Sequence, residues 1–340
     1  MSAFDWVVCP ECRQELTEST SELRCGACLR SFPVCVGIPD FRQAAEYAGK
    51  WDEETALLPE LVKSYDSCDL DGLLQIMLDG LARADEPHKQ RLRDYFVLGL
   101  AERAAHRARV IDFLCVQSGR PADFSQSLEI GCGAGATLFE LSRRGRAIGI
   151  DPNLLHLIIA KKHAQTLNLS VALVCGFAEC LPFRDGTFGF VHSMHTVEHF
   201  SDQPKGLSEM RRVVSDDGLV CFDIPNRFSL WREPHTKVWG IGFVPRRWTA
   251  LKVIKNQSLW ALSGLMEKAF GGQFSIDTAL VRFHVPGYRA SKAIKLIARV
   301  LLILERAPVL RSVVRFFQPG FEVVACKSPL RQRSGRASQN

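Results

Sequence analysis

Four cysteines near the N-terminus have the spacing of a metal site. Twelve residues separate two Cys-x-x-Cys pairs, whose members are Cys9, Cys12, Cys25 and Cys28. Pro10 and Gly26 help each pair to turn tightly, so that its thiolates can converge on one ion. Four thiolates saturate a tetrahedral Zn²⁺ and leave no position for water. So short a segment also buries too little core to fold alone. The pattern therefore predicts a structural zinc within residues 1–43.

A glycine-rich stretch, Gly131-Cys-Gly133-Ala-Gly135, follows a short apolar run. A turn of this kind between a strand and a helix lets a ligand approach the backbone closely. Asp151 ends the next apolar run, twenty residues after Gly131. A carboxylate at that place can accept hydrogen bonds from both hydroxyls of a ribose. The same side chain could cap the following helix, and the two roles are compatible.

A third cluster contains three histidines and an acid within eight residues, His192-Ser-Met-His195-Thr-Val-Glu198-His199. It leaves a predicted strand at the sheet edge where ligands bind in α/β proteins. Because imidazole titrates near neutral pH, His195 or His199 could act as general base for a hydroxyl acceptor. Alternatively, the Glu-His pair packs in the core or caps a helix.

The elements that must position these residues follow a regular alternation. Helical periodicity fills the stretches between short apolar runs, which read as strands at 127–133, 147–153, 171–180, 189–196 and 219–226. Repeated strand–helix units imply a parallel sheet with helices on both faces. The expected organisation is a zinc ribbon at 1–43, a helical cap at 44–120, a cofactor-binding core at 121–226 and a substrate-side region at 227–340.

Residues 126–226 resemble a class I S-adenosylmethionine-dependent methyltransferase of the small-molecule group. Glu129-Ile-Gly-Cys-Gly-Ala-Gly135 resembles the first motif of that family, and Gly149-Ile-Asp151 resembles the second. Ala178-Glu179-Cys-Leu-Pro-Phe183 resembles the motif on the adenine side, and Val197-Glu198-His199 resembles the exit of the fourth strand. The motifs occur in the order that the family has.

The resemblance implies an α/β fold, a Rossmann-like seven-stranded sheet that is mostly parallel, with its last strand antiparallel and helices on both faces. The segment 321–327 is a candidate for a late strand. The implied cofactor is S-adenosylmethionine, and the positions implied to bind it are Glu129, Gly131, Gly133, Gly135, Asp151, Ala178, Glu179 and His195.

One position departs from the family pattern. Phe177 stands where the family usually has Asp or Asn, whose side chain binds the adenine amine. Adenine recognition would then rest on backbone amides near Ala178 and on apolar contact. A register shift by one residue would instead bring in Glu179.

Two further resemblances bear on metals. The segment from His195 to His199 resembles the Glu-x-x-Glu-His that binds a divalent ion in ubiquinone-pathway O-methyltransferases and in small-RNA methyltransferases, with His195 replacing the first Glu. This implies a divalent ion at Glu198 and His199, to which His235 could add a ligand. The cysteine unit resembles zinc ribbons fused ahead of bacterial methyltransferases, which implies a packing or recruitment module.

Composition excludes several classes of protein. The 340 residues are 46% hydrophobic and 24% charged, which is ordinary for a globular protein and excludes a disordered or collagen-like chain. The net charge of +6 is uneven, because residues 228–340 hold 19 basic and 5 acidic residues. Such asymmetry suggests a region that faces a membrane surface or a nucleic acid, although a solvated basic face is equally compatible.

Residues 291–317 carry an apolar stripe beside cations at helical spacing. This pattern suits a helix lying in a membrane interface, and it also suits a helix packed on the sheet. The first residues contain acids and lack a long apolar core, so we expect a cytoplasmic protein with reduced thiols.

The leading hypothesis is methyl transfer to a small-molecule or lipid-linked acceptor, at a hydroxyl, with His195, Glu198 and His199 as catalytic candidates. One alternative is an RNA methyltransferase that uses the ribbon and the basic C-terminal region, although the ribbon itself is not basic. Another is a non-catalytic scaffold that binds the cofactor. Packing of the amphipathic segment on the sheet is favoured over peripheral membrane contact, which stays an alternative, and a nucleic acid is the less favoured partner.

Overall fold

The computed structural model describes residues 4, 6–19, 21–42, 56–81, 85–230, 255–278 and 292–328. His235, considered as a ligand of a divalent ion, and residues 231–254 of the expected substrate-side region lie outside the described residues. The chain divides into two compact units. The first comprises Met1–Ala108 with Phe124–Gly189, and the second comprises Arg109–Asp123 with Phe190–Asn340.

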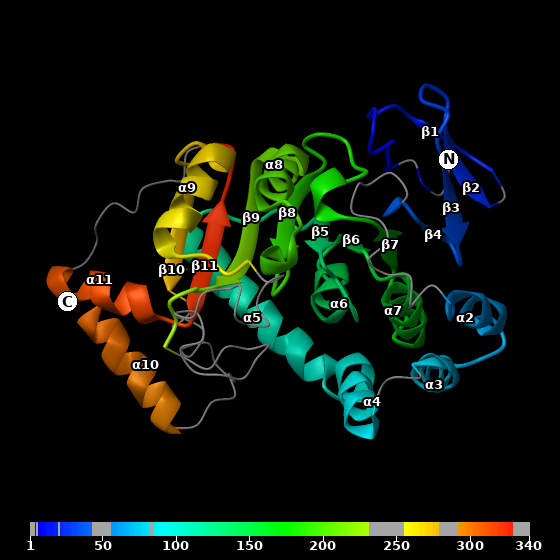
Figure 1. Cartoon of the computed structure of the whole chain (residues 1–340). Helices are drawn as coiled ribbons and strands as arrows, with labels where there is room; N and C mark the ends of the chain where they lie inside the picture. Colours follow the sequence, from blue (N-terminus) through cyan, green and yellow to red (C-terminus); the bar gives the residue numbers. More distant parts are fainter. Residues whose placement is uncertain are drawn as a thin grey trace. The chain divides into compact units, whose positions relative to one another are not determined.

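Seven strands form one mixed sheet in the order β10-β11-β9-β8-β5-β6-β7 (Figure 1). Their bounds are Gln126–Ile130 (β5), Arg146–Asp151 (β6), Val171–Cys175 (β7), Phe188–Ser193 (β8), Val214–Pro225 (β9), Phe274–Thr278 (β10) and Gly320–Ala325 (β11). Parallel ladders join β5 to β6 and β6 to β7, whereas β11 is antiparallel to β9 and to β10. The predicted α/β sheet with an antiparallel last strand is confirmed.

In the first unit, strands β5 and β6 are almost fully buried, as expected for parallel strands covered by helices. The helices and helical turns that lie wholly in this unit are α2 (Leu58–Ser64), α3 (Leu70–Gly80), α4 (Glu86–Arg93), η2 (Asp94–Leu98), α6 (Ala136–Ser142), α7 (Leu154–Thr166) and η3 (Ala178–Cys180). Helix α5 (Leu100–Ser118) belongs to this unit up to Ala108. Side-chain caps fix where several of these helices begin. Asn153 Oδ1 accepts from His156 N at 3.0 Å at the start of α7, directly after β6.

The last helical stretch of the expected cap at 44–120 is interrupted. Between α4 and α5 the five residues of η2 form a π-helical turn. Such a turn adds a residue and rotates the side chains on either side of it. It places Phe96 in the core, 1% exposed, with its carbonyl 3.0 Å from His163 Nδ1 on α7. The neighbouring Tyr95 thereby reaches the glycine-rich loop.

The cysteine-containing unit folds as a small antiparallel sheet that belongs to the first unit. Its strands are β1 (Leu16–Glu18), β2 (Glu22–Cys25), β3 (Ser31–Cys35) and β4 (Ile38–Pro39). Phe41 N donates to Cys175 O at 2.8 Å, and Asp40 pairs with Cys175, so the chain after β4 continues along edge strand β7. Trp6 stacks on Phe183 with ring centroids 6.1 Å apart.

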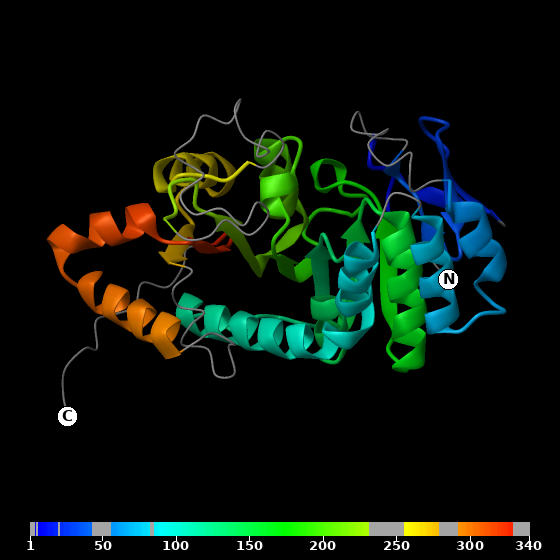
Figure 2. The ribbon, with the colours of Figure 1, turned by 60° about the horizontal axis from the view of Figure 1, so that its bottom comes forward.

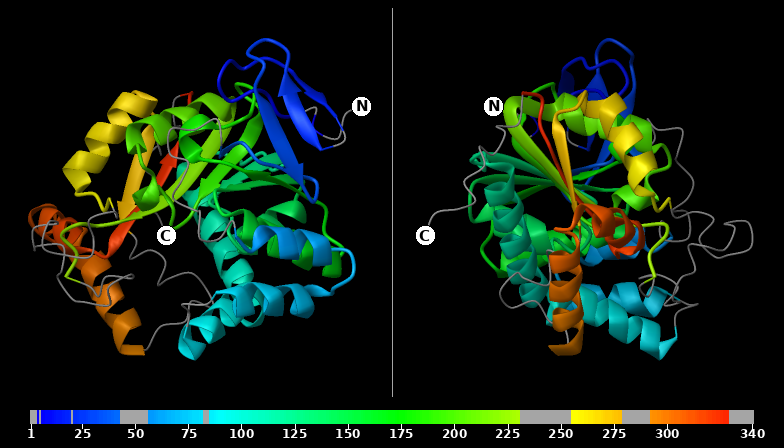
Figure 3. Two further views of the ribbon diagram at one scale, coloured as in Figure 1. Left: turned by 45° about the vertical axis from the view of Figure 1, so that its right-hand side comes forward. Right: turned by 90° about the vertical axis from the view of Figure 1, so that its left-hand side faces the viewer.

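The second unit contains α8 (Gln203–Val213), α9 (Leu259–Phe270), α10 (Lys292–Leu304), α11 (Pro308–Phe317) and the short turn η4 (Val197–His199). Within this unit, α8 and α9 cover one face of β9, β10 and β11, and the C-terminal part of α5 lies on the opposite face (Figure 3). Helices α10 and α11 form a hairpin (Figure 2).

Strand β9 begins earlier than expected, at Val214 rather than near Leu219. The segment that follows β11 binds the first residues of this strand. Ser328 Oγ donates to Asp216 O at 2.7 Å, and Lys327 Nζ lies 3.7 Å from Asp216 Oδ1. None of the helices in the described part of the chain has the length and apolar character needed to cross a bilayer.

Candidate functional site

The glycine-rich loop follows β5 and is hydrogen-bonded to the end of β6. Gly131 N and Cys132 N both donate to Ile150 O, at 2.8 and 3.2 Å. Gly133 has φ +48° and faces the Tyr95 hydroxyl so closely that a Cβ at this position would collide with it. Glycine is therefore required here for its conformation and for the space it leaves. The loop leads directly into α6, with its backbone amides at the carboxyl edge of the sheet.

Asp151, at the end of β6, is joined to that loop. Its Oδ2 accepts from Gly133 N at 2.9 Å, and its Oδ1 accepts from Asn153 N at 2.9 Å. Burial raises the pKa of Asp151 to about 6, although the two backbone N–H groups act in the opposite direction. The cap of the following helix, which the sequence offered as a second role for Asp151, is made by Asn153 instead, since the Asn153 side chain accepts from His156 N. Gly176 N at the exit of β7 donates to Asp151 O at 3.2 Å, so three strand ends meet at this residue.

Glu129, the acid of the first motif, is buried at 1% exposure. Its Oε1 lies 3.7 Å from Arg107 Nη1 on α5, and the same guanidinium donates to Thr137 Oγ1 at 3.1 Å. Burial raises the pKa of Glu129 to about 7, with Arg107 opposing that rise. The carboxyl can therefore hold a proton near neutral pH.

The exit of β7 carries the predicted adenine-side residues. Ala178 and Glu179 lie in the 3₁₀ turn η3 and are 7% and 3% exposed, and Phe177 before them is 7% exposed. The turn is closed by Cys180 N, which donates to Phe177 O at 3.3 Å. Burial of Phe177 supplies an apolar wall where the family usually has a polar side chain.

Two residues of the first unit were missed by sequence reasoning. Tyr95 Oη accepts from Ala134 N at 3.3 Å, and the Arg103 guanidinium lies over the Tyr95 ring, 5.0 Å from its centroid. Tyr95 comes into reach only through the π-helical turn, which periodicity cannot predict. A signal existed for Arg107, because it lies three residues after Ala104 and four before Ile111, both buried. A charge on the buried face of an amphipathic helix indicates a buried partner.

His195 and Asp223 form a pair in the second unit. The backbone N–H of His195 donates to Asp223 Oδ1 at 2.6 Å, and His195 Nδ1 lies 3.0 Å from Asp223 Oδ2. His195 has φ +55°, in the left-handed region that few non-glycine residues adopt. Asp223 is 5% exposed, whereas the His195 side chain is 48% exposed. This arrangement holds an accessible imidazole against a buried carboxylate.

The other two catalytic candidates have different surroundings. Glu198 is fully buried, and its backbone carbonyl accepts from Lys255 N at 2.7 Å. His199 is exposed and ends η4, with its N–H donating to Thr196 O at 2.8 Å. His235, the third ligand considered for a divalent ion, lies outside the described residues. The divalent ion at Glu198 and His199 stays a prediction.

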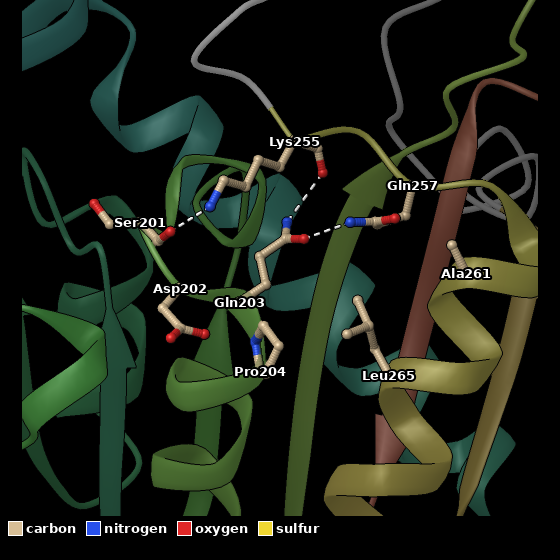
Figure 4. A pocket seen from close by; sticks show the side chains of 8 residues that line it. All are labelled: Ser201, Asp202, Gln203, Pro204, Lys255, Gln257, Ala261 and Leu265. Carbon is tan, nitrogen blue, oxygen red and sulfur yellow. Dashed lines mark hydrogen bonds between the residues drawn. The ribbon is translucent and has the colours of Figure 1, made fainter.

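A cavity of about 430 Å³, lined by both polar and apolar side chains, opens after β8 and β9 in the second unit. Its lining comprises Ser201, Asp202, Gln203, Pro204, Lys255, Gln257, Ala261 and Leu265 (Figure 4). Gln203 organises it, with its amide donating to Val197 O at 2.9 Å and to Lys255 O at 3.0 Å and accepting from Gln257. Gln257 also pairs with Asn226, directly after β9, so the cavity lies at the carboxyl edge of the sheet.

The four N-terminal cysteines converge. Cys9, Cys12, Cys25 and Cys28 place their Sγ atoms within 4.8 Å of one another, and among the residues that the structure describes they are the one cluster of this kind. The Cys9–Cys28 and Cys12–Cys25 sulfur separations are 3.6 and 3.4 Å. A tetrahedral ZnS₄ site with bonds of about 2.3 Å has sulfur separations of about 3.8 Å. The donor set and its geometry thus fit zinc.

Comparison with known proteins agrees with this geometry. Residues 128–222 match the family model described as Methyltransferase domain. The ubiquinone biosynthesis O-methyltransferase of Nitrobacter winogradskyi is 32% identical over 166 residues, which are 44% of this chain and 63% of that protein. The ajmaline N-methyltransferase of Rauvolfia serpentina is 31% identical over 97 residues, 27% of this chain and 33% of that protein.

Among solved structures, phosphoethanolamine N-methyltransferase 2 of Haemonchus contortus in complex with S-adenosyl-L-methionine is 16% identical with a TM-score of 0.44. The match covers 64% of this chain and 52% of that one. The chain spans between 33% and 65% of the length of the curated relatives it matches. Residues 128–222 of this chain are a methyltransferase domain.

Proposed function

We propose that this chain transfers the methyl group of S-adenosylmethionine to a small-molecule or lipid-linked acceptor, at a hydroxyl. One observation carries the proposal. Within the methyltransferase domain, the Asp151 carboxylate is bonded to the amide of Gly133 at the mouth of the glycine-rich loop. This arrangement puts an acceptor for ribose hydroxyls beside backbone N–H groups, as binding of a nucleoside-type cofactor requires.

The first unit supplies the cofactor-binding residues in this proposal. Asp151 would accept hydrogen bonds from the ribose. The loop at Gly131, Gly133 and Gly135 would let the cofactor approach the backbone. Glu129 on β5, next to Arg107, would stabilise this loop. Ala178 and Glu179 would bind adenine through the 3₁₀ turn, with Phe177 as its apolar neighbour. The bound cofactor supplies an electrophilic methyl on a sulfonium, so the protein has only to orient a nucleophile and remove a proton.

As the general base that removes the proton of the acceptor hydroxyl, His195 is favoured over His199. Both imidazoles are accessible, but His195 is held through Nδ1 and its own amide by a buried carboxylate. A carboxylate in this position fixes the orientation of the ring and leaves Nε2 to take up a proton from the acceptor. In the cavity of the second unit, Gln203 and Lys255 would bind hydroxyl or carbonyl groups of the acceptor. The names of the curated relatives, an O-methyltransferase of ubiquinone biosynthesis and an alkaloid N-methyltransferase, agree with a small-molecule acceptor.

Two measurements test the proposal. Titration calorimetry with S-adenosylmethionine asks whether the cofactor binds, and tritium transfer from labelled cofactor into extracted lipids, quinones and glycans asks what is methylated. Binding without transfer to any fraction would favour a cofactor-binding scaffold. The absence of binding would contradict the proposal at its first step.

The ribbon has a structural part in this proposal. Zn²⁺ held by Cys9, Cys12, Cys25 and Cys28 would order the small antiparallel sheet, after which Asp40 and Phe41 pair with Cys175 of β7. Four thiolates leave no open coordination position, so the ion would not take part in methyl transfer. The proposed boundaries stay those of the sequence: ribbon 1–43, helical cap 44–120, core 121–226 and substrate-side region 227–340.

A further inference from the structure

Helix α10 exposes a row of large apolar side chains. Their exposed fractions are high for aliphatic residues: Leu296 62%, Ile297 49%, Val300 46%, Ile303 62% and Leu304 37%. Spacings of three and four residues put them on one side of the helix. In α11, Leu310 and Val313 add two more, at 40% and 53%. A contiguous exposed aliphatic surface is unusual where a protein faces only water, and it marks an interaction site.

The same helix buries a different side. Ala298 is fully buried and forms a small core with Val314 of α11, against which Leu301 and Leu302 pack. The sequence left open whether the stripe packs on the sheet or faces a membrane. In the described part of the chain, the buried side of α10 faces α11, and the row from Leu296 to Leu304 is left accessible.

The hairpin is anchored as a defined structure. Arg315 Nε donates to Glu305 Oε1 at 2.6 Å, which closes the turn between the helices. Phe316 stacks on Phe228 with centroids 5.0 Å apart, and Asn226 Nδ2 donates to Phe316 O at 2.8 Å. The exposed row is therefore presented by a fixed element next to the end of β9.

Charge accompanies the apolar row. Residues 292–317 hold six basic residues and one acidic residue, Glu305, which is buried and paired with Arg315. Lys292 and Arg299 alternate with Leu296 and Ile303 along one line of the helix, at intervals of four, three and four residues. Long basic side chains in such a line can reach phosphates while the aliphatic ones enter an apolar layer.

We propose that the exposed face of α10, together with Leu310 and Val313 of α11, docks on an anionic membrane surface. Leu296, Val300 and Ile303 enter the boundary between headgroups and acyl chains, and Lys292 and Arg299 bind lipid phosphates. A nucleic acid would use the cations but would leave the aliphatic row in water, so a lipid surface fits the face better. Membrane binding by this face needs neither cofactor nor acceptor, so it can be tested independently of methyl transfer.

The test is co-sedimentation of the full chain with vesicles of phosphatidylcholine, with and without phosphatidylglycerol. The wild type should sediment with the anionic vesicles at low salt and be released as salt rises. L296E/I303E should weaken binding about tenfold or more, because it places two carboxylates at the apolar row, and K292E/R299E should weaken it comparably. V116E is the matched control, since Val116 on α5 is 71% exposed and lies outside the hairpin.

Three results would overturn the proposal. The first is failure of the wild type to bind anionic vesicles at low salt, and the second is equal binding by V116E and L296E/I303E. The third is a fall in melting temperature for L296E/I303E well beyond that for V116E, which would mean that other parts of the chain cover the row. Retention of RNA that K292E/R299E abolishes and L296E/I303E preserves, without vesicle binding, would identify a nucleic acid as the partner instead.

Discussion

Asp223 holds His195 at two points, through the backbone amide at 2.6 Å and through Nδ1 at 3.0 Å. The two residues are separated by 27 others in the sequence and come from the ends of neighbouring strands, β8 and β9. With Nδ1 committed to the carboxylate, Nε2 is the nitrogen that can take a proton from an acceptor. The backbone at φ +55° shows that the fold keeps a locally unfavourable conformation to maintain this pair.

Replacement of His195 by Asn should separate catalysis from folding. Asn tolerates the left-handed backbone conformation and can still bond to Asp223, so the melting temperature should change little. If His195 is the base, methyl transfer should fall about 10²- to 10⁴-fold, with cofactor affinity unchanged. Single-turnover tritium transfer measures the loss. His199→Asn is the matched control, and a larger loss for that variant would move the role to His199.

Replacement of Asp151 by Ala should weaken cofactor binding by one to two orders of magnitude, about 1.5–3 kcal/mol. The loss arises because the carboxylate would no longer accept from the ribose and would release the amide of Gly133. Calorimetric titration with S-adenosylhomocysteine gives the change in Kd. Asp66→Asn, at an exposed position of the same unit, should behave like the wild type. An unchanged Kd for Asp151→Ala would remove Asp151 from the site.

Glu129 should make stability depend on pH. Burial raises its pKa from 4.5 to about 7, so the folded state binds the proton more tightly than the unfolded state. Its contribution is therefore full at low pH and is lost as pH rises from about 4.5 through about 7. Relative to Glu129→Gln, the wild type should lose about 2–3 kcal/mol of unfolding free energy between about pH 5 and about pH 8.

Urea denaturation of both proteins at the two pH values measures this difference. Asp151, whose pKa is also raised, shifts stability in the same direction but is present in both proteins, so it cancels. Parallel pH profiles for the wild type and Glu129→Gln would show that Glu129 ionises normally.

Gly133 and Tyr95 should be energetically coupled. Gly133→Ala places a methyl against the Tyr95 hydroxyl at a backbone φ of +48°, so it should destabilise the chain and impair cofactor binding. Tyr95→Phe removes the colliding oxygen and should restore part of the loss, while the backbone strain of about 1 kcal/mol stays. A double-mutant cycle on unfolding free energy measures the coupling. Strict additivity would show that the two residues do not meet.

The zinc prediction concerns metal content and local order. Cys9→Ser should lower the zinc content from one ion per chain and expose residues 1–43 to proteolysis, while the core sheet stays folded. Cys35→Ser is the control, because Cys35 lies in the same small sheet but outside the cluster of four. Elemental analysis measures the zinc content, and limited proteolysis measures the exposure of residues 1–43. Purified wild-type protein without zinc would contradict the site.

Much of the fold is local in origin and could be predicted. The alternation of apolar runs with helical periodicity depends on near neighbours in the chain, so it shows β5 to β9, α6, α7 and α8 without tertiary information, whereas β10 was not predicted. The two Cys-x-x-Cys pairs and the Gly131–Gly135 loop are also local, since their chemistry requires particular residues at fixed spacing. The sequence alone thereby determined the class of fold, the metal-site candidate and the cofactor loop.

Other features depend on contacts between residues far apart in the chain. The π-helical turn at Asp94–Leu98 brings Tyr95 to Gly133, and the end of β9 brings Asp223 to His195. The exposure of Leu296 and Ile303 likewise depends on which side of α10 meets α11, because a helical stripe looks the same whether it is packed or accessible. Such features come from packing, where burial and close approach select one arrangement among several with the same local pattern.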